Sequence, residues 1–165
     1  MIEDILENIL DNLSEEVDEL DRLMAVSPDS ELLELGKRYL SDGNYHRAMR
    51  ILSKNARSDH SSRYIARLYP PLIKGILIYS NPFFNIKTEK PIIDPNKFMD
   101  SVIECLVIST QMHAEGELPK EDLFDLEKLV DKISFEKITF SGRDEFKKLY
   151  GKFKEYTIKV SLGEK

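Results

Sequence analysis

Residues 30–57 read SELLELGKRYLSDGNYHRAMRILSKNAR, and this stretch decides the predicted fold. We predict one helix over about 30–41 and a second over about 45–56, with an Asp-Gly-Asn turn at 42–44 between them. Small residues stand where the two helices would touch. The stretch is therefore predicted to be a helical hairpin.

The hairpin also carries a local pattern that looks like a tetratricopeptide repeat, at Leu35, Gly36, Tyr39, Gly43, Tyr45 and Ala48. Such repeats need about three copies to bury a continuous core. One period later the chain reads Tyr69-Pro70-Pro71, which does not repeat the pattern. We therefore interpret the match as a single helical hairpin and not as an array.

Outward from the hairpin, apolar periodicity and turn signals predict further helices over about 2–24, 60–69, 71–79, 95–113, 119–132 and 142–154. Asp94-Pro95 is a strong helix start, because a side-chain acceptor at the cap is followed by proline in the first turn. Residues 135–140 and 156–162 alternate β-branched and aromatic residues, which predicts short strands. We expect a mainly α fold: a compact helical domain of about six to eight helices, with at most a small C-terminal two-stranded sheet.

Charge divides the chain into distinct parts. The first 36 residues hold twelve acidic side chains and one basic one, Arg22. Residues 37–74 hold nine basic side chains and two acidic ones, a net charge of +7 in a protein whose total is −6. We interpret 1–28 as an acidic N-terminal amphipathic helix or arm and 29–165 as the main helical domain. The basic middle predicts contact with something anionic.

Length and composition exclude several classes of protein. The 165 residues suit one domain, or one domain with an appendage. The single cysteine, Cys105, excludes an internal disulfide framework and a cysteine-rich zinc or iron–sulfur site. No start typical of a signal peptide and no apolar run of about 20 residues is present. We expect a cytoplasmic protein with no membrane partner.

A catalytic centre is hard to build from this sequence, so we expect a protein that is not an enzyme and holds no metal. It contains three histidines and no HExxH, glycine-rich phosphate loop or GxSxG motif. Cys105 lies in an apolar stretch and is expected to be an inert core thiol. Four acids crowd one predicted helix, and we expect a solvated face there because nothing fixes a coordination geometry; they are Glu121, Asp122, Asp125 and Glu127.

The basic side chains fall on helix faces. Four of them recur at spacings of 3 and 4 on the helix over 45–56, namely Arg47, Arg50, Lys54 and Arg57. Arg63 and Arg67 do the same on the next helix, and Lys74 lies one turn into the helix that follows. Phosphate is one counter-charge for such a face. The alternative is pairing with the acidic N-terminus of this chain or with a partner's acids, and charge alone does not choose.

Four segments carry a resemblance to a known family: Ala48-Met49-Arg50-Ile51-Leu52, His60-Ser61-Ser62-Arg63, Leu72-Ile73-Lys74-Gly75-Ile76 and Asp94-Pro95-Asn96-Lys97-Phe98. In this order they resemble the C-terminal domain of the large subunit of archaeal and eukaryotic-type DNA primases. The likeness covers about 50 of the 165 residues. The family has a cluster-ligand cysteine where this chain has Ala48. A [4Fe–4S] cluster needs four thiolates, so we expect no iron–sulfur cluster and no other cofactor.

Because this chain is similar to the large-subunit domain but lacks its cluster, it resembles a small accessory subunit of archaeal primases. The resemblance implies a non-catalytic subunit of a heterotrimer with the catalytic small subunit and the large subunit. Such a subunit would hold the initiating nucleoside triphosphate, or the 5′-triphosphate of the primer, and touch the single-stranded DNA template. The residues implied are Arg63 and Lys74 for phosphate, Arg50 and Arg57 for phosphate or template, and His60 for phosphate or ribose. The alternative for His60 is a helix-start residue bonded to its own backbone.

Two other functions stay open at the level of sequence. One is a helical adaptor that docks protein partners through the 30–57 hairpin and binds no nucleotide. The other is a nucleic-acid-binding regulator without a link to a polymerase, which would bind duplex DNA alone.

Overall fold

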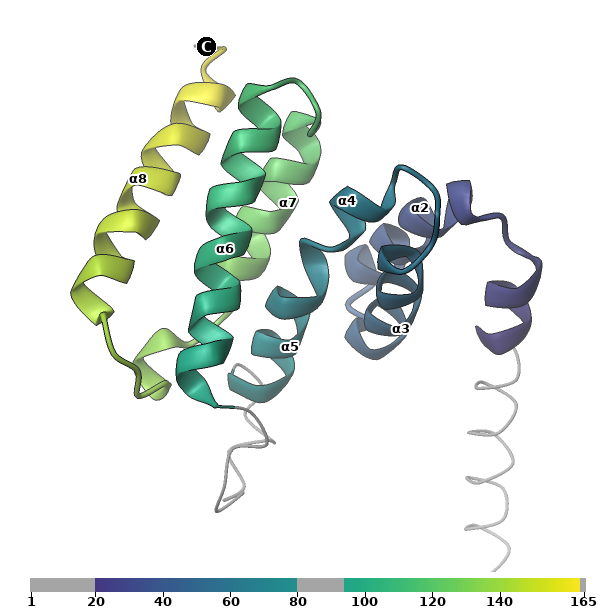
Figure 1. The fold of residues 1–165 in the computed structure, drawn as a ribbon, viewed down its shortest axis with the longest axis horizontal. Coiled ribbons are helices and arrows are strands. Elements are labelled where there is room, and N and C mark those ends of the chain that lie inside the picture. Colours follow the sequence, from purple (N-terminus) through teal and green to yellow (C-terminus); the bar gives the residue numbers. More distant parts are fainter. Residues whose placement is uncertain (1–19, 80–93, 164–165) are drawn as a thin grey trace, which may run out of the picture. The chain divides into compact units, whose positions relative to one another are not determined.

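The computed structural model describes residues 20–79 and 94–163, and over these ranges the chain is helical (Figure 1). The described residues form helices α2 to α8 and a short 3-10 helix, η2, and contain no strand. The prediction of a mainly α fold is confirmed. Contacts group the chain into two units, divided between Ala66 and Arg67. Most of the predicted acidic segment, residues 1–19, lies outside the described ranges.

The first unit is built on the predicted hairpin, whose helices are α2 (Asp29–Ser41) and α3 (Tyr45–Ala56). Gly43 turns the chain with a φ of 76°, and the Asn44 side chain caps α3 by accepting a hydrogen bond from the Arg47 backbone N–H. A Cβ on Gly36 would lie 2.5 Å from Leu52, so α2 and α3 approach closely at this glycine. The helical-hairpin interpretation is confirmed. The two helices meet at Gly36, one of the small residues of the predicted contact.

Residues 20–26, the described end of the acidic segment, are helical and pack on this hairpin. Leu20, Leu32 and Ile51 form a buried cluster, with Met24 among the partly buried side chains around it. Burying a leucine or isoleucine side chain is worth about 1.5–3 kcal/mol. Leu20 therefore anchors residues 20–26 to α2 and α3.

Helix α4 (Arg63–Ala66) is shorter than the predicted helix over 60–69. Side chains in the preceding residues bond the local backbone instead: the Ser58 hydroxyl accepts from the His60 N–H at 3.3 Å, and the His60 ring accepts from the Ser62 N–H at 3.1 Å. Such bonds compete with helix formation, which explains the late start of α4.

The second unit contains α5 (Tyr69–Tyr79), α6 (Pro95–Ala114), α7 (Lys120–Asp131), η2 (Phe135–Lys137) and α8 (Arg143–Ser161). Helix α6 packs against α5, α7 and α8, and Figure 1 shows α6, α7 and α8 running alongside one another. The core of this unit is mostly apolar, and its largest fully buried side chains include Leu72, Ile73, Met99, Val102, Leu106, Leu123, Leu126 and Ile138.

Two helix starts in this unit follow from local chemistry. The Asp94 side chain accepts a hydrogen bond from the Asn96 N–H at 2.9 Å, with Pro95 in the first turn, as predicted. Helix α5 begins at Tyr69, not after the prolines. Pro70 and Pro71 lie in its first turn, where a missing N–H leaves no helical bond unmade.

The two predicted strands are wrong. Residues 156–161 continue α8, because Phe146, Phe153 and Thr157 recur at helical spacing and are buried on one face. This packing overrides the β-branched residues near the end of the helix. In the 135–140 segment, Phe135–Lys137 forms η2, and Ile138 is extended and buried without a strand partner among the described residues.

The prediction of a solvated acidic face on α7 is wrong for one of its four acids, Asp122. Asp122 is only 2% exposed and accepts a hydrogen bond of 2.7 Å from the buried Tyr69 hydroxyl. Burial and the neighbouring Asp122 carboxylate both raise the pKa of Tyr69 above its ordinary value. Asp122 therefore ties α7 to the start of α5.

Candidate functional site

The basic row on α3 is largely engaged by the chain itself. Arg50 Nη2 lies 2.7 Å from Asp21 Oδ1, with both side chains about half exposed. Lys54 Nζ donates a hydrogen bond of 2.6 Å to the Met24 carbonyl. Residues 20–26 thus cover part of this row. The charge pattern left two alternatives open for the basic row. For Arg50, the structure contains the pairing with the acidic segment of this chain.

The two ends of the row have local roles. The Arg47 guanidinium lies over the Tyr39 ring, 5.8 Å from its centroid. Arg57 is exposed and forms the C-cap of α3. A cation there interacts favourably with the negative end of the helix dipole. Arg57 therefore stabilises α3 and at the same time presents a guanidinium to solvent.

His60 lies in an ordered loop between α3 and α4. The Ser62 backbone N–H donates to His60 Nδ1, which requires Nδ1 to be the unprotonated ring nitrogen and places the proton on Nε2. Ser62 Oγ lies 3.0 Å from Asn55 Oδ1 and 2.9 Å from His60 Nδ1. These bonds fix the ring. They match the alternative predicted for His60, a helix-start residue that bonds the local backbone. In that orientation its Nε2–H remains a donor on an exposed side chain.

Arg63 is half-buried and is held by the next residue. Its Nη2 donates a hydrogen bond of 2.8 Å to the Tyr64 hydroxyl, and its guanidinium carbon lies 4.8 Å from the Tyr64 ring centroid. Arg63 Nε is buried and has no hydrogen-bond partner in the described structure. A buried donor without an acceptor costs about 1–3 kcal/mol. The buried Nε is closed to a ligand, whereas the Nη2 end of the guanidinium, at the bond to Tyr64, is exposed.

Four of the five predicted site residues thus belong to the first unit, and three of them, Arg57, His60 and Arg63, fall within seven consecutive residues. The fifth, Lys74, belongs to the second unit, on α5. Its side chain is exposed while its neighbours Ile73 and Gly75 are buried, so it lies on the outer face of α5.

Two residues of this region were missed by sequence reasoning. Asn55 is fully buried at the end of α3 and organises the His60 loop through Oδ1. A single asparagine in a helical pattern gives no signal for such a role. Tyr64 could have been noted from the sequence, because aromatic side chains among basic ones are typical of surfaces that bind single-stranded nucleic acid.

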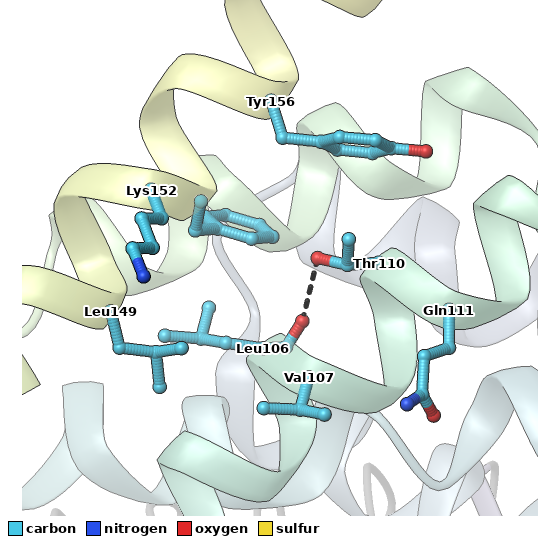
Figure 2. A pocket seen from close by; sticks show the side chains of 8 residues that line it. Leu106, Val107, Thr110, Gln111, Leu149, Lys152 and Tyr156 are labelled. Atoms are coloured by element: carbon cyan, nitrogen blue, oxygen red, sulfur yellow. Dashed lines mark hydrogen bonds between the residues drawn. The ribbon is translucent and has the colours of Figure 1, made fainter.

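A separate apolar pocket of about 290 Å³ lies between α6 and α8 (Figure 2). Figure 2 shows Tyr156 and Leu149 of α8 and Val107 of α6 around it, and Thr110 bonded to the Leu106 carbonyl. The Tyr156 hydroxyl is already within 2.7 Å of His113 Nδ1. The lining contains no carboxylate and no imidazole. The polar side chains of the lining are those of Thr110, Gln111, Lys152 and Tyr156.

Other chemistry is sparse in the described ranges. No group of three or more histidine, cysteine or acidic side chains there is placed to hold a metal ion. Cys105 is buried, and burial raises the pKa of its thiol to about 12. This confirms the prediction of a core thiol. Among the same residues, no helix is both long and apolar enough to cross a membrane.

No protein family, no curated protein and no solved structure matches this chain. The resemblance to primase large subunits therefore rests on the four sequence segments alone.

Proposed function

We propose that this chain is a non-catalytic accessory subunit of an archaeal DNA primase, similar to the subunit called PriX. It would bind the 5′-triphosphate of the initiating nucleotide and support de novo primer synthesis with the small and large subunits. The observation that supports this most directly is the 57–63 segment, in which the exposed side chains of Arg57 and His60 and the exposed Nη2 end of Arg63 fall within seven residues. The same segment lies within the family resemblance.

The chemistry of primer initiation suits such a surface. Starting a strand without an existing end requires two nucleotides to be held together until they are joined. Holding both reactants converts a termolecular encounter into a local one. The catalytic subunit holds the elongating nucleotide, so a second, cationic surface is needed for the first triphosphate. Guanidinium groups bind phosphate oxygens with two parallel hydrogen bonds.

Each residue of the proposed site has a distinct part. Arg63 is the main phosphate ligand, because the family resemblance assigns phosphate to it and the Nη2 end of its guanidinium is exposed. His60 donates from Nε2–H to phosphate or ribose. Arg57 adds charge from the end of α3. Arg50 contacts phosphate or template after leaving Asp21. The resemblance also assigns phosphate to Lys74, which belongs to the second unit and is proposed as a phosphate contact in its own right.

A binding titration tests this proposal. Nucleoside triphosphate binding to the full chain should weaken steeply between about 50 and 200 mM salt, as expected for phosphate contacts. Arg63→Ala should weaken it about tenfold or more, since hydrogen bonds to charged groups contribute about 1.5–3 kcal/mol. Arg38→Ala removes the same charge from α2, outside the proposed site, and should change affinity less than about twofold.

Two outcomes would overturn the proposal. One is the absence of salt-dependent triphosphate binding at the lower salt concentration. The other is an equal loss of affinity in Arg63→Ala and Arg38→Ala, because binding would then reflect net charge and not a site.

A second candidate function is a helical adaptor that binds protein partners through α2 and α3. The close contact between Gly36 and Leu52 favours it, because repeat hairpins that present binding surfaces also pack through small residues. This candidate predicts a partner recovered by pull-down with the wild-type chain. It also predicts no measurable affinity for nucleotides or DNA.

A further inference from the structure

Tyr64 is an exposed aromatic side chain in the middle of the candidate site. It is 49% exposed, and among the described residues it is the only aromatic one in the set of exposed large apolar side chains. The other members of that set are Val26, Val107, Ile158 and Leu162. An aromatic ring left this exposed beside basic side chains is a feature of surfaces that bind nucleotides and single strands.

The ring is held in place before any ligand arrives. Its hydroxyl accepts the Arg63 Nη2–H at 2.8 Å, and the guanidinium lies over the ring at 4.8 Å. Tyr64 and Arg63 belong to the same short helix, α4, directly after the His60 loop. An aromatic side chain that is already ordered loses little conformational entropy when a flat ligand stacks on it.

We infer that Tyr64 is a nucleobase-stacking residue, so that Arg63 and Tyr64 together contact the phosphate and the base of one nucleotide. This inference rests on the proposed function and names a second contact in the same site. Stacking is tolerant of base identity, because every base has a π-face. The site therefore selects nucleoside triphosphates over bare polyphosphate, without strong preference among the four bases.

A simpler role for Tyr64 would be to hold Arg63 in position. The two roles make different demands on the side chain. Stacking requires the ring and not the hydroxyl, whereas positioning Arg63 through the hydrogen bond requires the hydroxyl. Tyr64→Phe keeps the ring and removes the hydroxyl, and Tyr64→Leu removes both.

The test measures binding of ATP, UTP and inorganic tripolyphosphate to the full wild-type chain and to these two variants, with the urea unfolding midpoint as a check on folding. Tyr64→Leu should weaken binding of both nucleotides about tenfold, the scale of base–aromatic stacking, while tripolyphosphate affinity changes less than about twofold. Tyr64→Phe should bind all three probes within about threefold of wild type.

Three outcomes would overturn the inference. If the wild type binds tripolyphosphate and nucleotides equally, stacking is absent, although the proposed phosphate contact stands. If Tyr64→Phe and Tyr64→Leu lose tripolyphosphate affinity to the same extent, Tyr64 only positions Arg63. If the wild type binds none of the three probes, the proposed function fails together with the inference.

Discussion

Asp21 Oδ1 lies 2.7 Å from Arg50 Nη2, so the acidic N-terminal segment and the basic row of α3 are already in contact within the chain. The Lys54 ammonium reaches the Met24 carbonyl from the same row. A ligand phosphate that approaches Arg50 must therefore compete with a carboxylate of the same chain. Residues 20–26 limit access to part of the basic surface.

Removing this competitor should strengthen anion binding. Asp21→Asn keeps the size of the side chain and removes its charge, so we expect triphosphate affinity to rise about two- to fivefold at low salt. The unfolding free energy should fall by less than about 1 kcal/mol, because exposed ion pairs contribute little. Glu31→Gln, at an exposed position of α2, is the control for net charge. Equal gains in both variants would show that Asp21 does not cover Arg50.

The substitution is a better experiment than deletion of residues 1–28. Leu20 belongs to the buried cluster with Leu32 and Ile51, so a deletion would also remove part of the core. A change in affinity after deletion could then reflect partial unfolding.

The Tyr69–Asp122 hydrogen bond should make stability depend on alkaline pH. The pKa of Tyr69 is raised in the folded protein, so the folded state keeps this proton after the unfolded chain has lost it near the ordinary value of 10.0. The unfolded state then binds fewer protons, and the free energy of unfolding falls as pH rises above about 10, by up to about 1.4 kcal/mol per pH unit. Urea unfolding of wild type and Tyr69→Phe at about pH 8 and pH 11 measures this.

The difference between the two proteins is the informative quantity, because other groups titrate in both. Wild type should be the more stable at the lower pH, and its advantage should shrink at the higher one. Parallel losses of stability in the two proteins would contradict a proton held by Tyr69.

Two glycine substitutions should have opposite effects on the free energy of unfolding. Gly36→Ala would place a Cβ 2.5 Å from Leu52 and should cost about 1–3 kcal/mol through overpacking. Gly151 lies in α8, where an added Cβ would have no atom within 4 Å apart from its chain neighbours and the nearby backbone of its own helix, so Gly151→Ala should stabilise the protein by about 0.5–1 kcal/mol. Urea unfolding of both variants checks the signs. Stabilisation by Gly36→Ala would mean that α2 and α3 are not in close contact.

Cys105 should resist thiol reagents until the protein unfolds. Its pKa is raised to about 12 by burial, and its Sγ lies 3.1 Å from the Leu68 carbonyl oxygen, to which the thiol donates. The thiolate is the reactive form, so labelling in native buffer should be at least about a hundredfold slower than in urea. Rapid labelling of the native protein would place Cys105 at the surface.

Local chemistry made much of the fold predictable. The 42–44 turn, the small Gly36 and the Asp94-Pro95 start each specify a helix boundary or contact through neighbouring residues, and each is present in the structure. The strand predicted over 156–162 failed because these residues continue a helix whose buried face includes Phe153 and Thr157, while Ile158 of the same helix is exposed. Propensity read from a short window does not contain that packing.

The candidate site was predictable only in part. Basic spacing identified Arg50, Arg57, Arg63 and Lys74 as cations on helix faces. It could not show that Asp21 pairs with Arg50, because a contact between residues 29 positions apart depends on the fold. The role of the buried Asn55 and the proposed role of Tyr64 depend on the structure of the loop between α3 and α4.

The central claim is that this chain holds the initiating triphosphate for a primase. The most direct measurement is de novo dinucleotide synthesis by a heterotrimer of this chain with the small and large primase subunits, compared with a heterotrimer that carries Arg63→Ala and Lys74→Ala. We predict that the doubly substituted complex assembles and extends a preformed primer with a 5′-hydroxyl end normally, but forms dinucleotides at least about tenfold more slowly. Normal dinucleotide synthesis by that complex, or failure of the wild-type chain to associate with the two subunits, would contradict the claim.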